Sequence, residues 1–107
     1  MDIERLIAPS GILSFALFAF SFASGFERLG IDKYHRILSY ACLVVVIVHS
    51  AAAMMCSIFE PLGILASVGI IFTAVTGFFR ILRTHMVIAA LTLVISVLHV
   101  GFILYMK

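Results

Sequence analysis

The sequence predicts an all-α protein, a transmembrane four-helix bundle built from a duplicated helical hairpin. Of its 107 residues, 64% are hydrophobic and only 11% are charged, a composition that argues against a water-soluble domain. Four apolar stretches each approach the roughly 20 residues that a helix needs to cross a bilayer core. Because the connections between them are short, we expect residues 1–107 to form a single transmembrane domain.

We expect the four membrane helices at residues 6–26, 34–59, 62–80 and 84–106. The first is interpreted as a retained helix rather than a signal peptide. Asp2 and Glu4 accompany Arg5, so no positive region precedes it, and the apolar run exceeds the roughly 7–15 residues usual for a signal peptide. Pro9 and Pro61 are expected at the starts of the first and third helices, where the missing N–H of proline costs nothing.

The four helices resemble two copies of one hairpin. A shift of 52 residues aligns the first helix with the third without a gap, with matching Pro, Gly, Ile, Leu, Phe and Arg residues. Removing two residues from the first connection then places His35 on His85 and His49 on His99. Apolar helices resemble one another by composition, but composition explains matching Pro, Gly, Arg and His poorly. Two such hairpins would be related by a pseudo-twofold axis along the membrane normal.

The basic residues predict the orientation in the membrane. Five of them lie in or beside the first and third connections, namely Arg28, Lys33, Arg36, Arg80 and Arg83. Arg5 and Lys107 lie on the other side, so the positive-inside rule places both termini on the non-cytoplasmic side, in a membrane expected to be the prokaryotic cytoplasmic membrane. The net charge of +2 is no nucleic-acid signal, and the expected surroundings are membrane lipid.

The four histidines form two pairs of equal spacing, since thirteen residues separate His35 from His49 and His85 from His99. Fourteen positions are about four helical turns, which puts both histidines of a pair on nearly one face, roughly 21 Å apart. Parallel helices would bring His35 level with His85 and His49 level with His99. Two facing imidazoles are the axial ligands of a bis-histidine haem, so the spacing predicts two haem b groups, one above the other.

Other uses of these histidines are less consistent with the pattern. Zinc would need three or four ligands at one level, and Cys42 and Cys56 lie about 10 Å away along the helix. A proton relay would pair histidine with a carboxylate, and we expect none in the membrane interior. A single buried histidine often only hydrogen-bonds a neighbouring helix, but two equally spaced pairs favour a ligand role. Cys42 and Thr92 stand midway in each pair, a seven-residue step typical of helix packing.

Arg36, Arg80 and Arg83 are candidate partners for the propionates of the haem at His35 and His85, since guanidinium groups bind carboxylates well. The competing interpretation is that they only anchor the cytoplasmic membrane surface. No comparable basic group accompanies His49 and His99 apart from the chain ends.

These residues resemble those of di-haem b-type membrane cytochromes. The paired histidines are similar to the four-helix core of the cytochrome b of quinol-oxidising respiratory complexes. The run from His35 and Arg36 to Leu38, with His49 downstream, also resembles the ferric reductase-like transmembrane family, although Ser39 stands where that family often has glycine. Either resemblance implies that His35 and His85 hold one haem iron, and that His49 and His99 hold the other.

The predicted function is therefore electron transfer across the bilayer, by a subunit or partner of a redox complex rather than a stand-alone enzyme. A quinone is a candidate partner at a haem edge. The main alternative is a haem-free anchor or assembly subunit of a larger complex, whose histidines only make hydrogen bonds between helices. A small metal transporter is a third interpretation.

Overall fold

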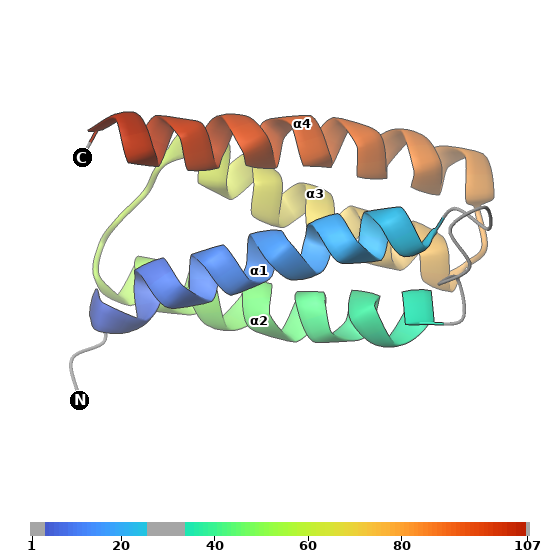
Figure 1. Ribbon diagram of the computed structural model, residues 1–107, viewed down its shortest axis with the longest axis horizontal. Helices are drawn as coiled ribbons and strands as arrows, with labels where there is room; N and C mark the ends of the chain where they lie inside the picture. Colours follow the sequence, from blue (N-terminus) through green and yellow to red (C-terminus); the bar gives the residue numbers. More distant parts are fainter. Residues whose placement is uncertain (1–3, 26–33, 107) are drawn as a thin grey trace. The chain divides into compact units, whose positions relative to one another are not determined.

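The structure, a computed structural model, describes residues 4–25 and 34–106, and Figure 1 shows that most of them are helical. This part of the chain has four helices and no strand: α1 (Glu4–Ser24), α2 (His35–Met55), α3 (Pro61–Phe78) and α4 (Leu82–Met106). The helices pack as two hairpins, α1 against α2 and α3 against α4. The prediction of an all-α fold made of two helical hairpins is confirmed.

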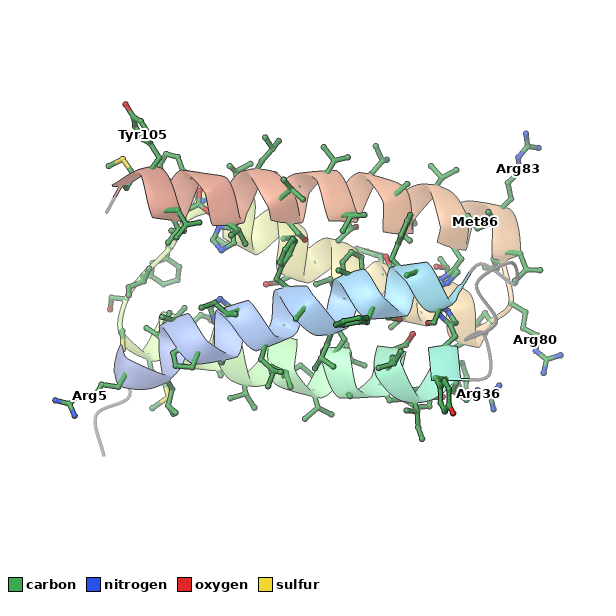
Figure 2. The ribbon with its side chains drawn as sticks, in the orientation of Figure 1. Arg5, Arg36, Arg80, Arg83, Met86 and Tyr105 are labelled. Carbon is green, nitrogen blue, oxygen red and sulfur yellow. The ribbon has the colours of Figure 1, made fainter. Side chains whose placement is uncertain are left out.

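Each of the four helices is long and apolar enough to cross a membrane, with spans of 20, 21, 18 and 25 residues. Large apolar side chains project from the helices of each hairpin (Figure 2). Ile37 and Phe78, for example, are 70% and 71% exposed. Water would not tolerate so continuous an apolar surface, whereas lipid tails match it. The chain is therefore an integral, multi-pass membrane protein in contact with lipid.

Several helix ends differ from the prediction, most of all the end of α2. α2 ends at Met55 rather than at residue 59, because Ser57 adopts a left-handed backbone with φ of 56°. The N–H groups of Ser57 and Ile58 then donate to the carbonyls of Met54 and Ala53, a hydrogen-bonding pattern that closes the helix. α3 ends in the same way at Phe78 rather than at residue 80, and α4 begins at Leu82 rather than at residue 84. Hydropathy did not reveal the end of α2, because the residues that follow Met55 are also largely apolar.

The two prolines play different roles. Pro61 is the first residue of α3, as predicted, and Glu60 caps this helix by accepting hydrogen bonds from the N–H groups of Leu62 (3.1 Å) and Gly63 (2.6 Å). Pro9, in contrast, lies inside α1, which already begins at Glu4. The predicted end of the first helix at Phe26 lies outside the described residues.

The two hairpins bury equivalent positions. The buried side chains of α1 are Ser14, Phe18, Ser21 and Ser24, and those of α3 lie 52 residues later, at Ala66, Ile70, Thr73 and Thr76. Cys42 and Val46 of α2 correspond in the same way to Thr92 and Ser96 of α4, shifted by 50 residues. These are mostly small residues, which let membrane helices approach closely. The structure thus supports the duplication read from the sequence.

Candidate functional site

Each histidine lies where its helix crosses a glycine of the antiparallel partner helix. In the first hairpin, a Cβ atom added at Gly11 would lie 2.8 Å from Cε1 of His49, and one added at Gly25 would lie 3.4 Å from Cε1 of His35. In the second hairpin the same test gives 2.8 Å between Gly63 and His99, and 2.8 Å between Gly77 and His85. The rings of His49, His85 and His99 therefore occupy the space that a side chain on the partner helix would fill, whereas His35 would make an ordinary van der Waals contact with it.

The glycines beside the histidines were not predicted as part of the site, although a signal was available. Gly11 and Gly25 are fourteen positions apart, and so are Gly63 and Gly77. This spacing equals that of the histidines on the opposite helix. The helices of each hairpin run antiparallel. Because the glycines and the histidines have the same spacing, a single alignment of the two helices places both histidines beside a glycine.

His35 and His85 are anchored in the same way, one in each hairpin. Nδ1 of His35 lies 2.8 Å from the carbonyl oxygen of Ser21 and 3.1 Å from the hydroxyl of Ser24. Nδ1 of His85 lies 2.7 Å from the carbonyl oxygen of Thr73, the residue equivalent to Ser21. A carbonyl oxygen only accepts hydrogen bonds, so Nδ1 of both rings carries the hydrogen.

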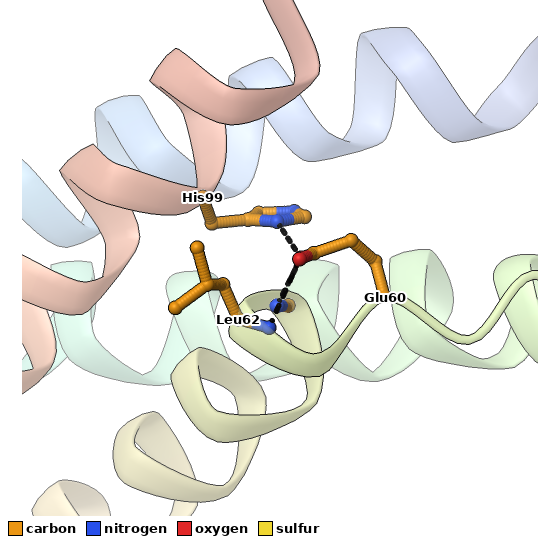
Figure 3. A network of polar contacts seen from close by, with 4 residues as sticks. Glu60, Leu62 and His99 are labelled. Carbon is orange, nitrogen blue, oxygen red and sulfur yellow. Dashed lines mark hydrogen bonds and ion pairs between the residues drawn. The ribbon is translucent and has the colours of Figure 1, made fainter. Parts of the chain in front are cut away.

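His49 and His99 use different acceptors. Nδ1 of His49 lies 3.1 Å from the hydroxyl of Ser10, and this hydroxyl donates its own hydrogen to the carbonyl oxygen of Leu6. The hydroxyl must therefore accept from His49. Nδ1 of His99 lies 2.5 Å from Oε2 of Glu60, as Figure 3 shows. An ionised carboxylate likewise only accepts, so this Nδ1 also carries a hydrogen.

The acceptors give the four rings one feature in common, a hydrogen on Nδ1. In the neutral imidazole only one nitrogen carries hydrogen, so Nε2 is the acceptor atom of such a ring. Nε2 is then the atom able to coordinate a metal, while the Nδ1–H bond fixes the ring orientation, as is usual for metal-bound histidine. These Nδ1–H hydrogen bonds would suit histidines that bind haem. They would equally suit histidines that only help the helices to pack.

Glu60 brings a carboxylate to His99 from just outside the membrane helices. It lies just before α3, yet α4 extends far enough for His99 to pack beside it. Burial by itself raises the pKa of the Glu60 carboxyl, but hydrogen bonds from the N–H groups of Gly63 and Leu62 and from His99 outweigh burial. The net effect lowers the pKa of Glu60, so the group is ionised at neutral pH.

The three predicted arginines are all exposed and lie at hairpin ends (Figure 2). Arg36 follows His35 in the first turn of α2 and lies at the opposite end of the hairpin from Arg5 on α1. Arg80 has a left-handed backbone just after α3, and Arg83 lies in the first turn of α4, two residues before His85. Arg28 and Lys33, which also entered the predicted orientation, lie outside the described residues.

The cysteines do not join the histidines. Cys42 is buried and donates from Sγ to the carbonyl oxygen of Ser14 (3.6 Å), and Cys56 is also a free thiol. Within residues 4–25 and 34–106, no group of three or more His, Cys, Asp or Glu side chains is arranged to hold a metal ion. The predicted pairing of His35 with His85, and of His49 with His99, joins the two hairpins and stays a prediction.

Comparison with known proteins adds no further identification. No protein-family model matches the chain, and searches of curated proteins and of solved structures gave no match.

Proposed function

We propose that the chain is a membrane cytochrome b that holds two haems and transfers electrons across the bilayer. The observation that carries the proposal is that all four histidines have Nδ1–H anchored in their own hairpin, which in the neutral ring leaves Nε2 as the atom able to coordinate iron. One histidine per helix at each level is the requirement of a bis-histidine haem. The resemblance to di-haem b-type cytochromes supports the same assignment.

In this proposal the two hairpins associate as a four-helix bundle with a pseudo-twofold axis along the membrane normal. His35 and His85 would hold one haem and His49 and His99 the other. Each haem, when bound, would supply an iron that changes between the ferric and ferrous states. With two histidines to hold each iron, the chemistry supplied would be electron transfer.

The anchored Nδ1–H groups would hold each ring ready for coordination. A ring fixed by a carbonyl, hydroxyl or carboxylate loses little freedom on binding, and its Nε2 becomes a better electron donor. The glycines would let each ring sit deep between its helices. Arg36, Arg80 and Arg83 would bind the propionates of the haem at His35 and His85, with their exposed guanidinium groups at the membrane surface.

We place the protein in a prokaryotic cytoplasmic membrane with both termini on the non-cytoplasmic side, following its basic residues. It would act with a redox partner protein or as a subunit of a redox complex, and a quinone could exchange electrons at a haem edge. A chain with two haems and no further site would serve as a conduit rather than as a stand-alone enzyme.

A second candidate, a haem-free anchor or assembly subunit, is favoured by one observation. Every histidine already has an acceptor for Nδ1–H inside its own hairpin, which a purely structural histidine also needs. The visible difference spectrum of the purified protein, dithionite-reduced minus oxidised, separates the candidates. Sharp b-type bands with about two haems per chain by pyridine haemochrome support the cytochrome. A protein that stays colourless after addition of haem would exclude it.

A further inference from the structure

The two hairpins differ in the group that anchors the second histidine. His49 donates to the neutral hydroxyl of Ser10, whereas His99 donates to the carboxylate of Glu60. These acceptors are not equivalent positions of the repeat. A shift of 52 residues carries Ser10 onto Leu62, and it carries Ala8 onto Glu60. The second hairpin therefore has a charged anchor where the first has a neutral one, and this anchor comes from a different place in the repeat.

The carboxylate of Glu60 is held in place independently of His99. Its oxygens accept hydrogen bonds from the backbone N–H groups of Leu62 and Gly63, so the first turn of α3 orients it. The side chains of Glu60 and His99 are only 15% and 20% exposed, which limits screening of their interaction by water. Figure 3 shows the carboxylate between the two N–H groups and the imidazole. The same glutamate thus caps a helix and anchors a histidine.

We infer that Glu60 is a positioning residue that acts through His99 and gives the haem bound by His99 a lower reduction potential than the haem bound by His35 and His85. The inference rests on the proposed function. A carboxylate that accepts from Nδ1–H makes the imidazole a stronger donor to iron, and its negative charge favours the ferric state. The other three histidines donate to neutral oxygens, and three arginines lie at the hairpin ends that carry His35 and His85.

The first experiment is a redox titration of the full-length protein with both haems bound, comparing the wild type with Glu60→Gln and Glu60→Ser. Gln keeps an acceptor oxygen without the charge. Ser keeps a helix cap for α3 but is too short to reach His99. Both variants should raise the midpoint potential of the haem that His99→Ala removes, and leave the other haem unchanged.

The outcome separates a positioning role from a capping role. If Glu60 only capped α3, Glu60→Ser would behave as the wild type, and the inference would be wrong. It would also be wrong if both haems shifted equally, or if neither did. Ser10→Ala is the matched control, because it removes a neutral acceptor, and it should cause a smaller shift than Glu60→Gln.

A second measurement does not need haem. Nitrogen-15 NMR of the haem-free, full-length protein in micelles, with labelled histidine, reports which ring nitrogen carries hydrogen. The wild type should show His99 with hydrogen on Nδ1, and Glu60→Ser should reduce that population while the signals of His35 and His85 stay unchanged. An unchanged His99 signal would overturn the positioning role. A changed His99 signal in a chain that binds no haem would refute the proposed function and the claim about the reduction potential. The hydrogen bond from His99 to Glu60 would still stand.

Discussion

The imidazole of His99 packs on Gly63 so closely that a Cβ atom added to the glycine would lie 2.8 Å from Cε1. A Cβ atom added to Gly11 in the first hairpin would lie equally close to Cε1 of His49. Real Cβ atoms do not approach a ring carbon so closely, so alanine at either position would require the ring or the helix to move. The contact makes each glycine a determinant of where its histidine lies.

Gly63→Ala and Gly11→Ala should therefore destabilise the protein by about 1–3 kcal/mol, the usual cost of overpacking, and reduce haem binding. Thermal unfolding in micelles and pyridine haemochrome analysis measure the two effects. Gly101→Ala is the control, since nothing lies within 4 Å of a Cβ atom added there. It should leave stability and haem content intact. A Gly63→Ala protein as stable and as haem-rich as the control would contradict the packing argument.

The proposed pairing across the hairpins predicts which haem each histidine holds. His49→Ala and His99→Ala should each leave one haem per chain and remove the same one, because either loss breaks the same pair of axial ligands. His35→Ala and His85→Ala should both remove the other haem. Low-temperature spectra and redox titration of the remaining haem identify it. If His49→Ala and His99→Ala kept different haems, the pairing would be wrong.

Gly69 and Thr92 form a second close contact, at the middle of the second hairpin. A Cβ atom added at Gly69 would clash with Oγ1 of Thr92 and lie 3.0 Å from its Cγ2. Gly69→Ala alone should therefore cost roughly 1–3 kcal/mol. Adding Thr92→Ala removes both of these atoms, so the double variant should lose less stability than the two single variants together. Unfolding of the three variants in micelles measures the coupling, and strictly additive effects would contradict a shared contact.

This contact belongs to the second hairpin alone. The shift of 52 residues carries Leu17 onto Gly69, and the shift of 50 residues carries Cys42 onto Thr92. The first hairpin thus has a large, half-buried side chain where the second has none. The repeat keeps the glycines beside the histidines but not the packing between them, which indicates that the two sets of positions are under different constraints.

The lowered pKa of Glu60 predicts how the stability of the haem-free protein depends on pH. A carboxyl whose folded pKa lies below its unfolded value of about 4.3 stabilises the fold above that value, and the stabilisation is lost as pH falls through the folded pKa. The free energy of unfolding should thus decrease as the pH falls below about 4.3, whereas this group should add no pH dependence near pH 7. Glu60→Gln should remove this part of the dependence. Parallel curves for the two proteins would contradict the prediction.

Ser57 ends α2 in a left-handed conformation that favours glycine. Ser57→Gly should therefore stabilise the protein by roughly 0.5–1 kcal/mol, since relief of the backbone strain exceeds the added entropy of the unfolded chain. Chemical unfolding in micelles measures the change. Ser50→Gly, in the interior of α2, is the comparison, and it should destabilise. A loss of stability in both variants would show that the left-handed residue carries no strain.

The sequence was sufficient to predict the membrane class, the four helices and the duplication. Membrane helices satisfy their backbone hydrogen bonds internally, so the length of an apolar run identifies them without knowledge of their neighbours. The end of α2 at Met55 was missed because Ile58 and Phe59 continue the apolar pattern after the chain has left the helix. Helix termination there depends on one left-handed residue, which hydropathy does not detect.

What the sequence by itself determined is the repeat, with its fourteen-position spacing of histidines. Only the tertiary structure decided how each histidine is held. Ser10 and His49, and likewise Glu60 and His99, are 39 positions apart, and they meet because each helix pair packs antiparallel in one particular register. That register follows from glycines that admit the imidazole rings. In the second hairpin this register places the carboxylate of Glu60, which lies outside the apolar helices, beside His99 of α4.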